Sequence, residues 1–388
     1  MIMATCCGLF TLNCVVSAQN WTLKSAPATY LSSVASSADG SKLVAAGGNV
    51  GLFLSTNSGS TWTNSFGGDW TRVASSADGA KLVAVTMGDV VTSTDSGATW
   101  QHDYPVEPER VWSAVASSAD GTKLVVAAYN GGPLYASANS GTSWVQLTNY
   151  PVANQWILAI ASSADGRTLA TASKKLVPFG QGGVYISTNS GQTWVQVTNL
   201  PNDDWDAIAL SADGTKMVAA PQNDSIYIST NTGATWSPTE TPSELWESVA
   251  MSADGTKVIA GPAAVIYTSV DSGITWTTNN VPFVNCVSVA SSADGNELEA
   301  VDSSVVGIWI SQTTPAPCLN ITPTNNNLTL SWVSPSTNFV LQQSSDLTTT
   351  NWVTLTNIPT LNLSNLQDEA TLSPSNNSSF YRLATPSF

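Results

Sequence analysis

The chain has 388 residues, a formal net charge of −15 at pH 7 and only 10% charged side chains. This length provides room for one large domain and a small one, with an ample hydrophobic core. An acidic chain with few charges has little attraction for nucleic acid or for an anionic membrane surface, so neither is expected as a partner. Downstream of the N-terminus, no apolar run is long enough to span a bilayer, and no segment has a helical period. The pattern therefore favours an all-β protein.

Residues 1–19 leave two interpretations open. An apolar run that ends at Val16–Ala18 is typical of a signal peptide with a cleavage site, although no Lys or Arg precedes the run. The alternation of Phe10, Leu12 and Cys14 with polar or smaller residues is instead typical of a strand, which could pair with a neighbouring subunit. Both interpretations predict an exported protein, secreted or extracellular.

From residue 20 onward, the sequence Ser-Ala-Asp-Gly recurs. Each copy follows one short apolar segment and precedes another, as Val115-Ala116 and Lys123–Ala128 do around the copy at 118–121. The seven aspartates are Asp39, Asp78, Asp120, Asp165, Asp213, Asp254 and Asp294. A repeat of about 40 residues that contains four short strands is typical of a β-propeller blade. We therefore expect one such turn between the first and second strands of every blade.

A second turn recurs six times with the pattern Ser-x-(Asp/Asn)-x-Gly-x-(Thr/Ser)-Trp, as at Ser93–Trp100. The side chain at the third position can accept hydrogen bonds from backbone N–H groups and close a hairpin, while Gly supplies a positive φ. The third positions are Asn57, Asp95, Asn139, Asn189, Asn231 and Asp271. This pattern resembles the Asp-box repeat of sialidase-type propellers. The resemblance implies a turn between the third and fourth strands of a blade. It indicates the architecture of the protein and says little about its activity.

The seventh repeat lacks the second turn. Gly307–Ser311 has the pattern of a third strand, but Gln312–Pro315 follows where the turn is expected. Asn20–Leu23 aligns with the segment that begins a fourth strand in the first repeat, Thr61–Asn64. We therefore predict a seven-bladed β-propeller over residues 20–312 that is closed by the N-terminal strand, an arrangement that removes two free sheet edges.

Beyond the repeats, residues 313–317 predict a short stiff linker. Residues 318–388 are rich in Asn, Ser and Thr, and strands are expected at 328–333, 339–344, 352–356, 370–372 and 380–383. This region resembles the small immunoglobulin-like or fibronectin-III-like β-sandwich at the C-terminus of many secreted bacterial proteins. The resemblance implies a module for anchoring, export or association.

Seven N-glycosylation sequons occur, five of them in the C-terminal region. They are Asn20, Asn223, Asn320, Asn327, Asn362, Asn376 and Asn377. Chance produces several sequons in a segment rich in Asn and Thr, and the motif has meaning only in a host that glycosylates. The sequons are weak support for an extracellular glycoprotein.

In a propeller, the loops before the first strand and after the second strand share the face that commonly binds ligands. Five blades carry Trp near the start of the first strand, and Leu31 and Cys286 hold the equivalent places in two others. The indoles are Trp70, Trp112, Trp156, Trp205 and Trp246. They could stack on sugar rings at a channel mouth. They could also be wedges between blades, and this interpretation is favoured because their positions repeat with the fold.

The sequence offers little for catalysis. Sialidases need an arginine cluster, and of the four arginines only Arg72 and Arg110 fall on the expected ligand face. Xyloglucan-cleaving enzymes resemble the repeat more closely, but they use two propellers. Acids occur in the loops on this face without an obvious pair: Asp69, Glu107, Glu109, Asp203, Asp204, Asp206, Glu240, Glu244 and Glu247. The single histidine, His102, lies in a predicted strand, so no Ser/His/Asp set can be built.

No cofactor or metal site is expected, because no Cys/His cluster has ligand spacing. Cys286 is expected as a buried or free thiol rather than as a bridge to Cys318. Photosystem-assembly propellers also resemble this repeat, but they use a basic patch that the acidic chain lacks. We therefore predict a non-catalytic extracellular structural or interaction protein that self-assembles, as a filament or surface layer, or that is adhesive. Its partners would be itself or surface glycans. The alternative is a carbohydrate-binding or glycoside-hydrolase-like propeller that acts on extracellular polysaccharide.

Overall fold

The computed structural model of the chain describes residues 21–24, 30–103, 110–129, 131–150, 155–175, 182–201, 203–262, 265–281, 285–303, 307–312, 319–324, 327–333, 340–345, 352–355, 359–363, 367–373 and 379–384. The regular structure in these ranges consists of strands alone, which confirms the all-β prediction for them. None of them forms a helix that is long and apolar enough to cross a membrane.

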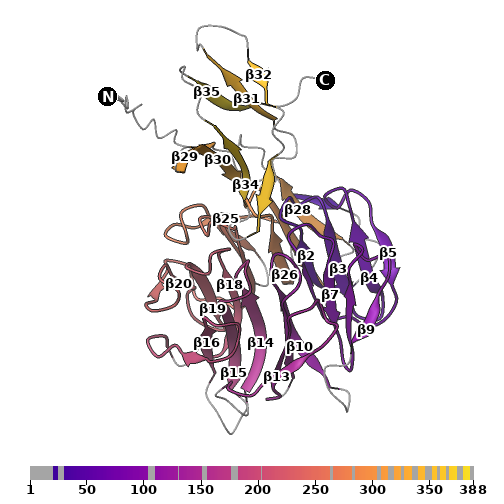
Figure 1. The fold of residues 1–388 in the computed structure, drawn as a ribbon. Coiled ribbons are helices and arrows are strands. Elements are labelled where there is room, and N and C mark those ends of the chain that lie inside the picture. Colours follow the sequence, from indigo (N-terminus) through magenta and orange to yellow (C-terminus); the bar gives the residue numbers. More distant parts are fainter. Residues whose placement is uncertain are drawn as a thin grey trace.

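Seven antiparallel four-stranded sheets lie between Trp21 and Gln312 (Figure 1). In six of them, the four strands follow one another in the chain. The first three sheets are β2 (Leu31–Ser36), β3 (Leu43–Gly47), β4 (Gly51–Ser55) and β5 (Thr63–Phe66); β6 (Arg72–Ser75), β7 (Leu82–Val85), β8 (Val90–Ser93) and β9 (Gln101–Asp103); and β10 (Trp112–Ser117), β11 (Leu124–Ala128), β12 (Leu134–Ser137) and β13 (Val145–Leu147). The next three are β14 (Gln155–Ser162), β15 (Leu169–Lys175), β16 (Gly183–Ser187) and β17 (Val195–Gln196); β18 (Trp205–Leu210), β19 (Met217–Pro221), β20 (Tyr227–Ser229) and β21 (Ser237–Pro238); and β22 (Trp246–Met251), β23 (Val258–Pro262), β24 (Ile266–Ser269) and β25 (Thr277–Asn279).

The seventh sheet takes one strand from the other end of the chain. It contains β26 (Cys286–Ser291), β27 (Glu297–Asp302), β28 (Ile308–Gln312) and β1 (Trp21–Lys24), and β1 pairs with β28. Trp21 lies opposite Ser311, and Lys24 lies opposite Ile308. Each sheet shares a hydrophobic core with the next one, and the seventh shares a core with the first.

The seven Ser-Ala-Asp-Gly turns are joined by backbone hydrogen bonds. The alanine N–H of each turn donates to the alanine carbonyl of the next, beginning with Ala38 to Ala77 at 2.7 Å. The last bond runs from Ala293 back to Ala38 at 2.8 Å. Within a turn, the serine hydroxyl donates to the aspartate, as Ser118 does to Asp120 at 2.6 Å. The short Ala side chain allows the turns to approach one another this closely, and the seven alanines form one buried cluster.

The six Ser-x-(Asp/Asn)-x-Gly-x-(Thr/Ser)-Trp turns, here called Trp turns, are held by their third residue. In the second sheet, Asp95 accepts hydrogen bonds from Ser93 Oγ at 2.8 Å and from the Thr99 N–H at 2.9 Å. Together with the Thr99 hydroxyl, which contributes most, these bonds lower the pKa of Asp95 to about 2. The other five turns have the same bonding at Asn57, Asn139, Asn189, Asn231 and Asp271.

The glycine of each Trp turn also receives a side chain from the preceding sheet. Gly97 has φ +81°, and a Cβ at this position would lie 2.4 Å from Leu54 Cδ1. Ile310, Ile186 and Ile228 occupy the equivalent space at three other junctions. Glycine is therefore required twice over, by backbone conformation and by the packing of neighbouring sheets.

In the third sheet, Ala136 holds the position of Leu54, and the space at the glycine of the next sheet is occupied instead by Leu147, whose Cδ1 would lie 2.7 Å from a Cβ on Gly191. A pocket of about 270 Å³ remains between the third and fourth sheets. Its lining includes Leu124, Ala136, Val145 and Leu169, and it lies at the end of the sheets that carries both kinds of turn. At the junction of the first and second sheets, where Leu54 is present, only about 20 Å³ remains.

Replacing Ala136 with isoleucine is expected to raise the free energy of unfolding by about 0.5–2 kcal/mol, because the new side chain fills an existing gap. Chemical denaturation with a fluorescence readout measures the change. The matched reverse substitution, Leu54→Ala, would open the same gap between the first and second sheets and cost about 2–3 kcal/mol. A lowered stability of Ala136→Ile would show that the pocket cannot accept a branched side chain.

The C-terminal region forms two small sheets, which Figure 1 shows in orange to yellow outside the seven larger ones. One has the order β29-β30-β34-β33 and the other β32-β31-β35. Their strands are β29 (Asn320–Thr324), β30 (Asn327–Val333), β31 (Val340–Ser344), β32 (Val353–Thr354), β33 (Thr360–Asn362), β34 (Gln367–Leu372) and β35 (Phe380–Ala384). Leu330, Trp332 and Leu341 form the centre of their own core.

Candidate binding site in the central cavity

A cavity of about 330 Å³ lies between the first strands of the sheets. It is lined from β6, β10, β14, β18, β22 and β26, and by Lys174 of β15. Its charged side chains are Arg72, Lys174, Asp206 and Glu247. Two potential cations and two carboxylates therefore face one space of the size of a small-molecule site.

Local backbone irregularity places several of these side chains. Six of the seven first strands contain a β-bulge near their start, directly after the opening residue in five of them and after the third residue, Ile157, in β14. In β18, for example, Trp205 pairs with Pro221 and Ala207 with Ala220, so that Asp206 has no partner in the ladder. A bulge redirects the side chain of its extra residue. Of the bulge residues, Leu158, Asp206, Glu247 and Val287 line the cavity.

Asp206 and Lys174 connect the fifth and fourth sheets. Lys174 Nζ lies 2.8 Å from Asp206 Oδ1. Burial raises the pKa of Asp206 to about 6, and the nearby Glu247 and Asp204 act in the same direction, while Lys174 opposes them. The cavity therefore carries a carboxyl group whose pKa lies about two pH units above its ordinary value of 3.8, at about 6.

Arg72 enters the cavity from the second sheet. Its Nη1 donates to the Thr71 carbonyl at 2.9 Å, and no carboxylate of the described residues lies within ion-pair distance of it. Burial lowers the pKa of Arg72, and the charge of Glu247 opposes this effect. Because no described carboxylate pairs with it, the Arg72 guanidinium can donate hydrogen bonds from its remaining N–H groups to acceptor atoms of a ligand.

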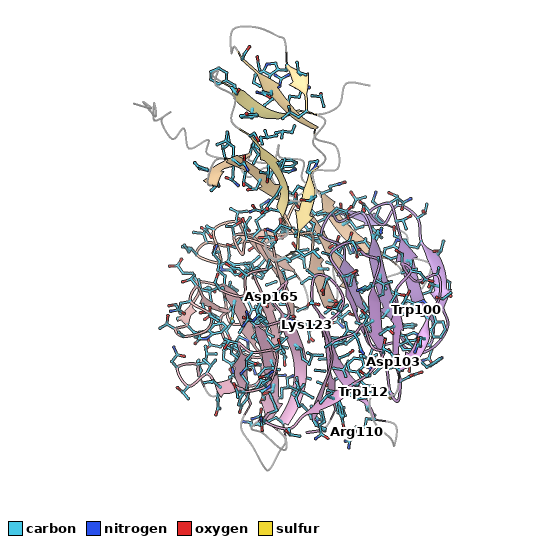
Figure 2. The ribbon with its side chains drawn as sticks, in the orientation of Figure 1. Trp100, Asp103, Arg110, Trp112, Lys123 and Asp165 are labelled. Atoms are coloured by element: carbon cyan, nitrogen blue, oxygen red, sulfur yellow. The ribbon has the colours of Figure 1, made fainter. Side chains whose placement is uncertain are left out.

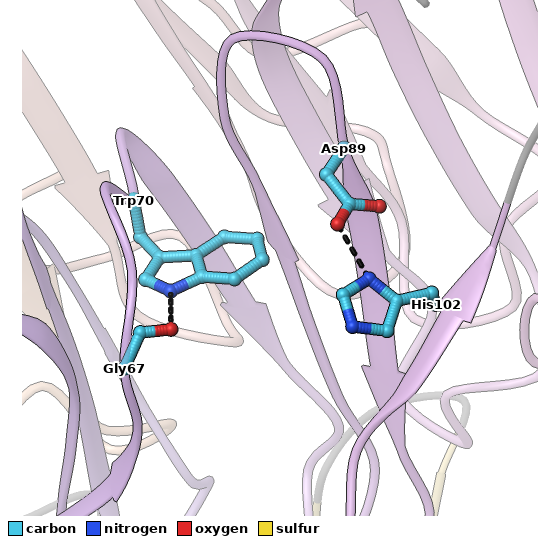
Figure 3. A network of polar contacts seen from close by, with 4 residues as sticks. All are labelled: Gly67, Trp70, Asp89 and His102. Atoms are coloured by element: carbon cyan, nitrogen blue, oxygen red, sulfur yellow. Dashed lines mark hydrogen bonds and ion pairs between the residues drawn. The ribbon is translucent and has the colours of Figure 1, made fainter.

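Four of the five predicted aromatic side chains are packed away from this cavity surface. Trp70, Trp112, Trp205 and Trp246 are at most 3% exposed. The last three contact the rings of Tyr135, Tyr227 and Tyr267 edge to face, and the Trp70 indole donates to the Gly67 carbonyl at 3.2 Å (Figure 3). Buried in this way, these indoles have no open face for a sugar ring.

Trp156 differs from the other four. It is partly exposed and stacks on Tyr129, with 4.9 Å between ring centroids and 29° between planes. Tyr129 is 39% exposed. Trp156 lies opposite Lys174 in the β14–β15 ladder, so this aromatic pair adjoins the charged part of the cavity. The sequence pattern singled out Trp156 but not its partner Tyr129.

The other residues considered from the sequence lie elsewhere. Asp69 accepts the Asn49 N–H and Asp204 accepts the Lys175 N–H, so both close loops. Glu107 and Glu109 lie outside the described residues, and Asp203, Glu240 and Glu244 do not line the cavity.

Arg110 lies two residues before β10, the strand that begins at Trp112, and it does not line the cavity (Figure 2). His102 lies on β9, the outer strand of the second sheet. Its Nδ1 bonds to Oδ2 of Asp89, which directly precedes β8 (Figure 3). The Cys286 thiol is buried and free, and Cys318 lies outside the described residues.

The sequons are spread over the surface of the described residues. Asn223 is exposed between β19 and β20, and Asn320 and Asn327 are exposed on β29 and β30. Asn362 is half-buried and donates to Glu369 at 2.9 Å. Asn20, Asn376 and Asn377 lie outside the described residues. Within the described part, no group of three His, Cys, Asp or Glu side chains is placed to hold a metal ion.

Comparison with known proteins identifies the class of fold. No family model matches the chain, and no curated protein matches it either. Among solved structures, YCF48 from Cyanidioschyzon merolae aligns with a TM-score of 0.59 at 15% identity, over 76% of this chain and 98% of that one. A structure of YCF48 bound to D1 peptide aligns with a TM-score of 0.57 at 18% identity, over 76% and 97%. The GH74 xyloglucanase of Xanthomonas campestris aligns with a TM-score of 0.59 at 14% identity, over 81% of this chain and 59% of that one. The repeated sheets and these similarities make the protein a β-propeller.

Proposed function

We propose that the protein is an extracellular binding protein that holds a saccharide unit of an extracellular polysaccharide in its central cavity. The observation that carries the proposal is the set of Arg72, Lys174, Asp206 and Glu247 around one cavity of about 330 Å³. Sugar hydroxyls both donate and accept hydrogen bonds, so they match a site that offers donors on one side and acceptors on the other. The partly exposed Tyr129–Trp156 pair adds an apolar surface beside the cavity.

Binding is favoured over cleavage by the state of the two carboxylates. Glycoside hydrolysis needs one carboxylic acid that is free to protonate the leaving group and a second carboxylate for attack. Asp206, the more buried of the two, is held by Lys174 at 2.8 Å. The similarity to a xyloglucanase supports a saccharide as ligand, because it shows that this fold is compatible with recognition of a polysaccharide.

The proposed architecture is a seven-bladed propeller over residues 20–312, with β1 as the closing strand of the seventh blade. The cores shared by neighbouring sheets, the first and seventh included, support this inference. We further propose that the Trp turns are Asp-boxes, that residues 318–388 form an immunoglobulin- or fibronectin-III-like module behind a linker at 313–317, and that the protein is exported. Residues 1–19 would then be a leader or an exchanged strand.

The saccharide site is tested by substitution at the cavity. Arg72→Gln and Glu247→Gln are each expected to weaken retention of the bound oligosaccharide at least about tenfold, since each removes a charge-assisted hydrogen bond. Binding is found first with an array of plant and bacterial oligosaccharides and then measured by calorimetry. Glu240→Gln, an exposed acid outside the cavity, is the matched control and should bind as the native protein does. Failure of the native chain to retain any oligosaccharide would overturn the proposal.

A second candidate function is self-assembly into filaments or layers. The observation that favours it is the four-residue strand β1, which joins a sheet otherwise built from the far end of the sequence. The same strand from a second copy has the same sequence and would fit the same edge of β28. The structure of YCF48 bound to a peptide supports the idea that a propeller can receive a polypeptide segment. Light scattering and electron microscopy test it, and a monodisperse monomer at every concentration and pH would contradict it.

A further inference from the structure

Three of the four charged side chains of the central cavity are departures from the repeat. Arg72 holds a position that is serine or alanine in the other six first strands: Ser33, Ala114, Ala159, Ala207, Ser248 and Ser288. All of these small residues except Ser33 also line the cavity, so the position faces it in most sheets. Asp206 and Glu247 hold the preceding position, which is uncharged in the other five strands. These charges are therefore additions to a wall that is otherwise uncharged.

The order of the first strands places Arg72 and Glu247 on different sides of the cavity. Each first strand contacts the first strand of the next sheet, and β26 contacts β2. β6, which carries Arg72, is separated from β22, which carries Glu247, by β2 and β26 in one direction and by β10, β14 and β18 in the other. No two first strands are further apart in this order. The guanidinium and the carboxylate therefore enter the cavity from nearly opposite walls.

Of the two possible ion pairs in the cavity, one is closed and one is open. Lys174 Nζ and Asp206 Oδ1 lie 2.8 Å apart, so these two charges compensate each other. Arg72 and Glu247 lie beyond ion-pair distance of each other and of every other charged group of the described residues. The charge of Glu247 still acts on Arg72, because it opposes the lowering of the Arg72 pKa. The cavity thus lies between two opposite charges that have no partner in contact.

The rest of the lining offers these two charges little compensation. The residue that follows the Arg72 position is valine or isoleucine in all six first strands that line the cavity: Val73, Val115, Ile160, Ile208, Val249 and Val289. Such side chains have no hydrogen-bonding atoms, and charges interact more strongly beside them than in bulk water. A ligand with one sign of charge would therefore meet attraction on one wall and repulsion on the opposite one.

We propose that the saccharide unit held in the cavity is zwitterionic, with a carboxylate that binds Arg72 and a free ammonium group that binds Glu247. A uronic acid joined to an amino sugar without its acetyl group has this chemistry. The planar guanidinium can bind a carboxylate through two parallel hydrogen bonds, and a carboxylate accepts hydrogen bonds from an ammonium group. The inference rests on the saccharide site proposed above, and it names the class of sugar that fits the open pair of charges.

Calorimetry of the full chain tests the inference with oligosaccharides of matched backbone and different charge. Hyaluronan and heparosan oligosaccharides alternate a uronic acid with N-acetylglucosamine through different linkages, and both are anionic. Removal of their acetyl groups makes the same chains zwitterionic in slightly acidic buffer. Chitosan oligosaccharides are cationic, and cello-oligosaccharides are neutral. We expect a deacetylated oligosaccharide to bind at least about tenfold more tightly than its acetylated parent and than the cationic and neutral chains.

Two substitutions should change this preference in opposite ways. Glu247→Gln should remove the gain from deacetylation, so that the acetylated and deacetylated forms bind within about twofold of each other. Arg72→Gln should remove the contribution of the uronate, so that the deacetylated form and chitosan bind within about twofold of each other. Glu240→Gln removes an exposed acid outside the cavity and should keep the native preference. If Arg72→Gln does not fold, Glu247→Gln, at an exposed side chain, decides the question alone.

The outcomes separate this inference from the saccharide site on which it rests. Equal binding of acetylated and deacetylated forms by the native chain, or an unchanged preference in Glu247→Gln, would overturn the zwitterionic ligand. Tightest binding of a neutral or singly charged oligosaccharide would also overturn it, while the saccharide site would stand. If the native chain retains no oligosaccharide of any charge, the saccharide site fails and the zwitterionic ligand falls with it.

Discussion

Replacing Trp246 with alanine is expected to lower the free energy of unfolding by about 3 to 5 kcal/mol. The indole is fully buried at the start of β22 and packs between the fifth and sixth sheets. Its Nε1 donates to the Asp224 carbonyl at 2.9 Å, and its ring meets Tyr267 edge to face at 5.3 Å. The substitution removes the burial, the hydrogen bond and the aromatic contact together. Equilibrium unfolding in denaturant measures the loss.

Trp156→Ala is the matched comparison, because Trp156 begins a first strand in the same way but is partly exposed. Its substitution should cost less than about 1.5 kcal/mol. It should also weaken oligosaccharide binding, since it removes one ring of the stacked pair. A cost for Trp246→Ala that is no greater than the cost for Trp156→Ala would show that the buried indoles are not the wedges that hold neighbouring sheets together.

Replacing Glu299 with valine is expected to raise the free energy of unfolding by about 2 to 4 kcal/mol at about pH 8. Glu299 lies in β27 at 0% exposure, and its Oε2 has no hydrogen-bond partner among the described residues. At that pH, the native chain must either bury a charge or hold a proton that the unfolded chain releases. Because the folded pKa is raised, native stability falls as the pH increases above the ordinary value of 4.5. The valine variant lacks this slope, so its advantage should shrink in acid.

Thermal or denaturant unfolding at a series of pH values measures this difference. Glu240→Gln removes an exposed acid instead, and it should change stability by no more than about 0.5 kcal/mol at any of them. A stability gain of Glu299→Val that is the same in acid and in alkali would show that packing, and not the charge of the carboxylate, accounts for the effect.

The turns of this protein were predictable because each is specified within a few consecutive residues. Ser118, Asp120 and Gly121 define one kind of turn by a hydrogen bond and a positive φ, and Ser93, Asp95 and Gly97 define the other. Their regular spacing was enough to predict an all-β propeller, which the sheets and the similar solved structures support. Local chemistry repeated at a fixed interval is the part of a fold that a single sequence expresses most directly.

The charged side chains of the cavity were harder to predict from the sequence than the turns. Asp206 and Glu247 were two among nine acids assigned to loops, whereas both lie on β-bulges that turn them into one cavity. A bulge has no strict sequence signature, since it depends on how two strands pair. One signal was available: in both blades, the acid directly follows the Trp that begins the strand.

Two acids of β27 were visible in the sequence, but their departure from the repeat was not recognised. Aligning the seven second strands shows Glu297 against lysine and Glu299 against apolar residues. What the alignment cannot supply is the burial of Glu299 or the closeness of Glu297 to the turn of Gly40, because these depend on which sheet follows the last one. Departures from a repeat become informative once neighbours in space are known.

The pairing of Trp21 with Ser311 spans about 290 residues of chain. During synthesis, β1 leaves the ribosome before β28, the strand with which it pairs in the described part of the chain and which is among the last segments of the propeller to emerge. At about 5 to 20 residues per second, β1 waits roughly 15 to 60 s with its backbone donors and acceptors unsatisfied by a sheet. A circularly permuted chain that carries β1 directly after β28 would remove this delay. It should give a higher yield of correctly folded protein and fewer inclusion bodies when translation is slowed.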